Sequence, residues 1–124
     1  MIWLKTGAVM LAAAIAAGAF GAHGLEARLS VDRLELGETA ARYLAYAALA
    51  VLVIGSVHSR EPSYASRLGR AALCVALGGV VFSSTVFALA LGGPGILGAV
   101  TPLGGAAMIL GLLGFAVALP TSGE

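Results

Sequence analysis

Four long apolar segments, separated by short charged or glycine-rich stretches, constrain the fold of this chain more than any other feature. The segments cover residues 4–22, 40–57, 71–91 and 96–119. A helix over the first segment is about 28 Å long, which is enough to cross the hydrocarbon core of a bilayer. We therefore expect an all-α integral membrane four-helix bundle, formed as a single domain over residues 1–124, with the lipid bilayer around it.

The composition supports the same fold class. Hydrophobic residues make up 60% of the 124 residues and charged residues 10%, and the chain contains no Asn and no Gln. Soluble domains are roughly 45–50% apolar and about 25% charged, so this chain has too little polar surface for one. The net charge of +1 gives no reason to expect nucleic-acid binding. The single Cys74 lies in an apolar segment, where it cannot form an internal disulfide or a zinc site, and we expect it to pack.

The first segment ends in the sequence Gly18-Ala-Phe-Gly-Ala-His23. Small residues at Ala14, Gly18 and Ala22 recur every four positions and would form a smooth stripe on a helix. His23 follows where lipid gives way to water. We expect it to cap the first helix or bridge it to another helix, and ligand binding is the alternative. A cleavable signal peptide is the other interpretation of this segment. Because three further spans follow, we expect the segment to stay and pack against them.

The stretch Gly24–Thr39 is the longest charged part of the chain, with four acidic residues and two arginines. Intermittent leucines are consistent with a short helix lying at the membrane interface, and a solvated loop is an equal alternative. The acidic residues do not have a spacing typical of metal ligands. We expect no metal or cofactor site.

Hydroxyl side chains occur inside the third and fourth segments. Ser83, Ser84 and Thr85 lie near the middle of the third. There they can donate to the preceding turn or to a neighbouring helix, or line a small polar cavity. In the fourth segment, Thr101 followed by Pro102 fits an N-cap with proline at the first helical position. We therefore expect the regular helix to begin near Pro102.

The fourth segment is also the richest in small residues. Gly104 and Gly105 follow the proline closely, and Gly111 lies further along the same segment. Small residues let helix backbones approach closely in membranes. We expect this helix to lie at the centre of the bundle, with Gly105 and Gly111 at helix contacts. The uncharged turn over residues 92–95 predicts that the third and fourth helices form an antiparallel hairpin.

Basic residues are distributed slightly unevenly between the two ends of the predicted bundle. Four basic residues fall on the side that holds both termini: Lys5, Arg60, Arg67 and Arg70. Three fall on the other side: Arg28, Arg33 and Arg42. Because basic residues favour the cytoplasmic side, we predict a multi-pass protein of the inner membrane with both termini in the cytoplasm.

The order of these motifs resembles the small four-helix membrane proteins of the domain of unknown function 423 family, which includes YgdD and transmembrane protein 256-like proteins. The motifs cover nearly the whole chain: Gly18–His23, the aromatic second segment around Tyr43, Phe82–Thr85 and Thr101–Gly105. The resemblance implies a multi-pass inner-membrane protein without supplying a biochemical role. Where the family tends to have Gln and His in the second span, this sequence has Leu44 and Ala47, so a polar pairing with His23 is missing.

Two functions are consistent with the sequence. The abundant Gly and Ala favour a structural or accessory membrane component, packing in a larger complex or as a homo-oligomer. The alternative is a small channel or transporter with a polar path near Ser83, Ser84, Thr85 and His23. A carrier that uses an intramembrane carboxylate has no such residue here. We expect no enzyme, because no nucleophile is paired with a base and no second cysteine is present. The sequence identifies neither a small-molecule ligand nor a partner.

Overall fold

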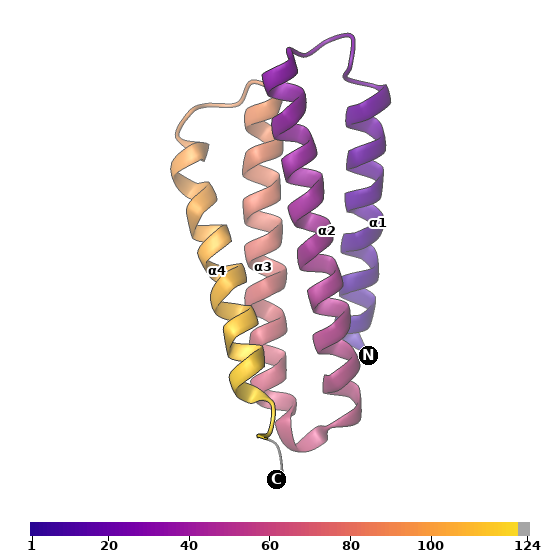
Figure 1. The fold of residues 1–124 in the computed structure, drawn as a ribbon, viewed down its shortest axis with the longest axis vertical. Coiled ribbons are helices and arrows are strands. Elements are labelled where there is room, and N and C mark those ends of the chain that lie inside the picture. Colours follow the sequence, from indigo (N-terminus) through magenta and orange to yellow (C-terminus); the bar gives the residue numbers. More distant parts are fainter. Residues whose placement is uncertain (122–124) are drawn as a thin grey trace.

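The computed structural model describes residues 1–121, which form four long helices (Figure 1). The elements follow the chain as α1 Ile2–His23, α2 Val31–Arg60, the 3-10 turn η1 Pro62–Tyr64, α3 Ala65–Ala90 and α4 Leu97–Ala118. Each long helix is long and apolar enough to cross a membrane. The expected all-α membrane architecture is confirmed.

The helices lie side by side in chain order, and each runs antiparallel to the one before it (Figure 1). α1 packs chiefly on α2 and α4 chiefly on α3, with little contact between α2 and α4. The N-terminus, the α2–α3 connection and the end of α4 lie at one end of the bundle. The α1–α2 and α3–α4 connections lie at the other end. The predicted antiparallel hairpin of the third and fourth helices is confirmed.

The prediction that the fourth helix is central is wrong, because α3 has the central role on that side of the bundle. In the most apolar window of α3, 44% of residues are buried, against 17% in α4. The cause is a pair of adjacent glycines on α3. A Cβ placed on Gly78 would lie 2.6 Å from the carbonyl oxygen of Gly104 in α4. A Cβ placed on Gly79 would collide with the Cβ of Ala47 in α2. α3 therefore approaches a neighbour closely on each side.

The charged stretch between the first two spans is neither a separate interfacial helix nor a loop throughout. After a few turn residues, α2 begins at Val31, and its first residues carry much of this charge. Ser30 is the N-cap, and its Oγ accepts a hydrogen bond from the backbone N–H of Arg33 at 3.3 Å. Asp32 lies in the first turn, where a negative charge is favourable. With 30 residues, α2 is about 45 Å long, so it extends well beyond the hydrocarbon core.

The turn between α3 and α4 is formed by a glycine in the left-handed region. Gly92 has φ +94°, and its N–H donates to Leu89 O at 3.1 Å. The next N–H, of Gly93, donates to Ala88 O at 2.8 Å. These two bonds form a Schellman motif, which satisfies carbonyls at the end of α3 without side-chain caps. Glycine is needed at position 92 because a Cβ would be strained there.

α4 begins earlier than the sequence suggests. It starts at Leu97, so Pro102 lies inside the helix and Thr101 is not its N-cap. The first turn is closed by backbone bonds to the preceding loop, from Leu97 N to Pro94 O and from Gly98 N to Gly95 O. Pro102 lacks the N–H that would bond the carbonyl of Gly98 in the first turn, and its ring crowds that carbonyl. The bonds to the loop therefore allow α4 to begin at Leu97, before the start near Pro102 that the Thr-Pro pattern predicts.

Candidate functional site

The closest contact between α3 and α4 is backbone against backbone. A Cβ built on Gly104 would lie 2.5 Å from the N of Phe82 and 2.7 Å from the O of Gly78. Both distances are far below ordinary van der Waals contact, so no larger residue fits without separating the helices. Gly105, next in sequence, is less confined: its Cβ would lie 3.6 Å from the Phe82 ring. Of the two adjacent glycines, Gly104 therefore makes a close backbone contact and Gly105 makes an ordinary side-chain contact.

A pair of threonine hydroxyls lies beside this contact. The Oγ1 atoms of Thr85 in α3 and Thr101 in α4 are 2.7 Å apart. Each hydroxyl is also within reach of its own helix: Thr85 of Val81 O at 2.8 Å, and Thr101 of Leu97 O at 2.9 Å. Each hydroxyl has one proton, and the possible acceptors are the other hydroxyl and the backbone carbonyl of its own helix. One proton joins the hydroxyls, while the other hydroxyl donates to a backbone carbonyl. Both groups are thus satisfied inside the protein, which a hydroxyl in lipid requires.

The three consecutive hydroxyls of α3 point in different directions, because successive helix residues are rotated by about 100°. Thr85 joins the α4 contact. Ser84 is exposed and donates to Val81 O of its own helix at 3.3 Å. Ser83 is 5% exposed, and its Oγ has no hydrogen-bond partner in the described chain. The structure therefore does not bring the three hydroxyls together to line one polar path.

The predicted site residues on α1 lie apart from these hydroxyls. His23 is exposed at the end of α1, and within residues 1–121 its side chain makes no hydrogen bond. The end of α1 is capped instead by the N–H of Gly24, which donates to Phe20 O at 2.6 Å. A Cβ on Gly18 would lie 3.7 Å from Ala41 of α2, while one on Gly21 would meet nothing within 4 Å. Of the small-residue stripe, Ala14 is buried and Gly18 packs on α2, while Ala22 is exposed. The expected bridge from His23 stays a prediction.

Aromatic side chains form a feature that the sequence indicates only in part. The ring of Tyr43 lies 5.3 Å from that of Tyr46 and 4.9 Å from that of Phe82, measured between centroids. These rings border an apolar groove of about 350 Å³ between α2, α3 and α4. Ala47 also lines the groove and meets Gly79 at the α2–α3 contact. The position where the resembling family tends to have a polar residue therefore serves packing here.

The hydrogen bonds and close contacts of these groups join or cap helices. Within residues 1–121 no three His, Cys, Asp or Glu side chains gather as metal ligands. The described acidic residues all lie in connections or near helix ends: Glu26, Asp32, Glu35, Glu38 and Glu61. The hydroxyls of Ser84, Thr85 and Thr101 thus have backbone carbonyls or one another as partners, while Ser83 has none within residues 1–121. Cys74 is exposed on α3, so the expected packing of its thiol in the interior is wrong.

Comparison with known proteins now identifies the family. A family model described as "Protein of unknown function (DUF423)" matches residues 17–105. The chain belongs to this family. A UPF0382 membrane protein of Staphylococcus epidermidis is 37% identical over 117 residues, covering 94% of this chain and 93% of that protein. The UPF0382 membrane protein YwdK of Bacillus subtilis is 33% identical over 117 residues, covering 94% of both chains.

The family assignment confirms the resemblance seen in the sequence motifs, and no solved structure matches the chain. The matched range includes all the motifs that carried the resemblance, from Gly18 to Gly105. The relatives are described as membrane proteins, in agreement with the four apolar helices. This DUF423 protein is therefore a multi-pass membrane protein. Neither the family description nor the names of these relatives assigns an activity.

Proposed function

We propose that this protein is a structural or accessory component of the inner membrane, which packs laterally against another membrane protein or a second copy of itself. The observation that carries the proposal is the use of the polar groups between α3 and α4. The Thr85–Thr101 pair, 2.7 Å apart, holds the two helices together and leaves no hydroxyl proton for a ligand. Hydroxyl groups that are hydrogen-bonded within the protein in this way favour a packing role over catalysis or transport.

The alternative of a channel or transporter has less support. Ionisable residues inside spans usually mark ion paths and proton relays. The acidic residue that lies furthest into α2 is Glu38, eighth of its 30 residues and before the apolar segment that begins at residue 40. The candidate lining is also dispersed, with Ser84 exposed on α3 and His23 exposed at the end of α1. A continuous polar path has no obvious place between these positions.

The lateral surface supports the packing role. The groove bordered by Tyr43, Tyr46 and Phe82 is apolar, and Gly105 is among the residues that line it. A groove lined by aromatic rings and a glycine suits an apolar helix lying across it, since small residues permit close approach. α1 and α4 flank the bundle on opposite sides.

The charge distribution supports a cytoplasmic location of both ends of the chain. The end of the bundle that holds the N-terminus carries Lys5, Arg60, Arg67 and Arg70, together with the acidic Glu61. The other end carries three arginines and four acidic residues. A reporter that fluoresces only in the cytoplasm, fused after the last residue, should be bright, and alkaline phosphatase at the same place should be inactive. The opposite pair of signals would reverse the orientation.

The packing role is tested by purifying a C-terminally tagged protein in mild detergent, with the mass of the particle and its chains determined together. We expect a defined oligomer or a stoichiometric partner. A photo-crosslinking residue at Leu112, in the aromatic groove, should give one discrete adduct. The control position is Val9, which is 70% exposed on α1. A monomer with no adduct at Leu112, together with ion flux in liposomes, would replace the proposal with transport.

A further inference from the structure

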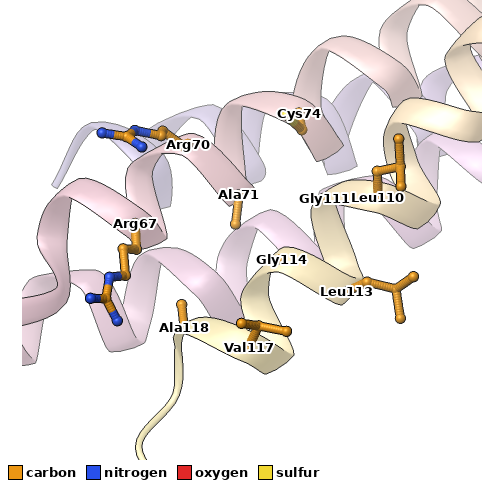
Figure 2. A pocket seen from close by; sticks show the side chains of 10 residues that line it. All are labelled: Arg67, Arg70, Ala71, Cys74, Leu110, Gly111, Leu113, Gly114, Val117 and Ala118. Carbon is orange, nitrogen blue, oxygen red and sulfur yellow. The ribbon is translucent and has the colours of Figure 1, made fainter.

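A second groove lies between the first turns of α3 and the last turns of α4, at the end of the bundle that holds the N-terminus. Its volume is about 550 Å³, within the range of sites for small ligands. Its walls are almost entirely apolar, and basic residues stand at one end (Figure 2). They are Arg67 and Arg70 of α3. Neither the helix-packing role nor the family description accounts for this combination.

Glycines on α4 create the groove. At Gly111 the helices touch: a Cβ there would lie 2.7 Å from Val75 Cγ2 and 3.0 Å from Ala71 O. About one turn further along α4, a Cβ on Gly114 would meet nothing within 4 Å. The space that a side chain at position 114 would occupy is therefore empty beside a tight contact. Val117, which borders the groove beyond Gly114, is 83% exposed and does not close it.

The two arginines give the open end of the groove a positive charge. They are three residues apart on α3, so they lie on neighbouring positions of one helix face. Nη2 of Arg70 is 3.4 Å from Oγ of Ser66, whereas Arg67 makes no hydrogen bond within residues 1–121. Figure 2 shows Arg67 beside Ala118, the last residue of α4. The described acidic residue nearest in sequence is Glu61, which precedes η1. Within residues 1–121 the guanidinium of Arg67 therefore has no hydrogen-bond partner and can bind an anion.

The groove is also long enough along α3 to hold part of a lipid acyl chain. Arg67 and Cys74 both line it, and seven residues of helix separate them by about 10 Å. One leaflet of the hydrocarbon core is about 15 Å thick. A phosphate held by arginines where the apolar part of α3 begins would place the start of an acyl chain along this wall. A free phosphate would use the arginines alone and leave the apolar groove empty.

We propose that this groove binds one anionic phospholipid, with its phosphate at Arg67 and Arg70 and an acyl chain beside Gly111 and Gly114. Guanidinium groups bind phosphate oxygens with paired, charge-assisted hydrogen bonds. Basic pockets between membrane helices on the cytoplasmic side typically hold such headgroups. A zwitterionic headgroup is a poorer ligand, because its own ammonium group competes for the phosphate.

The test is lipid binding to the purified full-length protein in detergent, counted by native mass spectrometry during titration with phosphatidylglycerol or phosphatidylcholine. Each basic residue beside an anionic surface contributes about a fivefold gain in binding. Replacing both (Arg67→Gln with Arg70→Gln) should therefore weaken phosphatidylglycerol binding about 25-fold. The matched control is Lys5→Gln with Arg60→Gln, which removes the same charge at the same end of the bundle but outside the groove. It should leave binding within about twofold.

A second variant tests the apolar part of the site. Gly114→Leu fills the groove without a collision at its Cβ, and it should abolish the bound lipid while the protein keeps its helicity and thermal stability. Gly21→Leu, at a position that also meets nothing within 4 Å, should leave binding unchanged. Equal binding of the two lipids would overturn the proposal. So would equal losses in the two charge variants, unaltered binding in Gly114→Leu, or displacement of the lipid by inorganic phosphate alone.

Discussion

Replacing Gly104 with alanine tests whether the α3–α4 backbone contact sets the geometry of this protein. The new Cβ would lie 2.5 Å from the Phe82 N and 2.7 Å from the Gly78 O. Both atoms belong to the backbone of α3, so neither can rotate away as a side chain would. Reaching ordinary contact from 2.5 Å requires α4 to move by about 1 Å. Since Thr101 precedes Gly104 by less than one turn, this movement also stretches its 2.7 Å bond to Thr85.

The magnitude follows from two opposing effects. Overpacking a tight contact costs about 1–3 kcal/mol. Replacing glycine with alanine inside a helix gains up to about 1 kcal/mol. Gly114→Ala on the same helix has the second effect alone, because a Cβ there meets nothing within 4 Å. The difference in unfolding free energy between the two variants therefore isolates the contact, and we expect Gly104→Ala to be less stable than Gly114→Ala by about 1–3 kcal/mol.

The assay is reversible unfolding of both variants and the parent protein in the same mixed micelles, followed by helical circular dichroism. We expect the order of stability to be Gly114→Ala, then the parent, then Gly104→Ala. Equal stability of the two variants would refute the close backbone contact between Gly104 and α3. A stabilised Gly104→Ala would do the same, since only an open position gains from alanine.

Three further predictions use the same assay. Thr85→Val and Thr101→Val, combined in a double-mutant cycle, should show a coupling of about 0.6 kcal/mol and no more than about 1.7, and no coupling would mean that the hydroxyls are not bonded to each other. Ser83→Ala should raise stability by about 1 kcal/mol by removing a buried hydroxyl without a partner, whereas a clear loss would show that this hydroxyl is hydrogen-bonded. Gly92→Ala should lower stability by about 1–2 kcal/mol, because its φ is +94°. Gly95→Ala, whose Cβ meets nothing within 4 Å, should be neutral, and equal effects at the two positions would contradict the left-handed turn.

The number and nature of the helices are predictable because membrane spans are specified by length and apolarity, which the sequence displays directly. Helix ends are less predictable. Much of the charged stretch after the first span forms the first turns of α2. Ser30 caps the start of this helix at Val31, well before the apolar segment begins. The start of α4 is also predicted wrongly. The first N–H groups of α4 donate to the loop carbonyls of Pro94 and Gly95, whereas the Thr-Pro pattern predicts an N-cap at Thr101.

The candidate site is partly predictable for a different reason. Hydroxyls in a span predict hydrogen bonding between helices, and Thr85 and Thr101 fulfil this. Which of three consecutive hydroxyls takes part depends on the rotation of α3 about its axis, which its neighbours determine. Composition alone gives no such rotation. The isolated position of Ser83, buried without a partner, is likewise a result of packing.

The order of the helices depends on where small residues lie rather than on how many there are. α4 has the longer series of glycines, yet Gly114 meets nothing within 4 Å and only part of the series contacts α3. α3 has two adjacent glycines, and adjacent positions on a helix point about 100° apart. Gly78 therefore admits the backbone of α4 while Gly79 admits Ala47 of α2. A helix with small residues on two faces can have two close neighbours, whereas a single stripe allows only one. Adjacent glycines therefore mark a central helix only where they face two different neighbours, since Gly104 and Gly105 of the outer helix α4 both face Phe82 of α3.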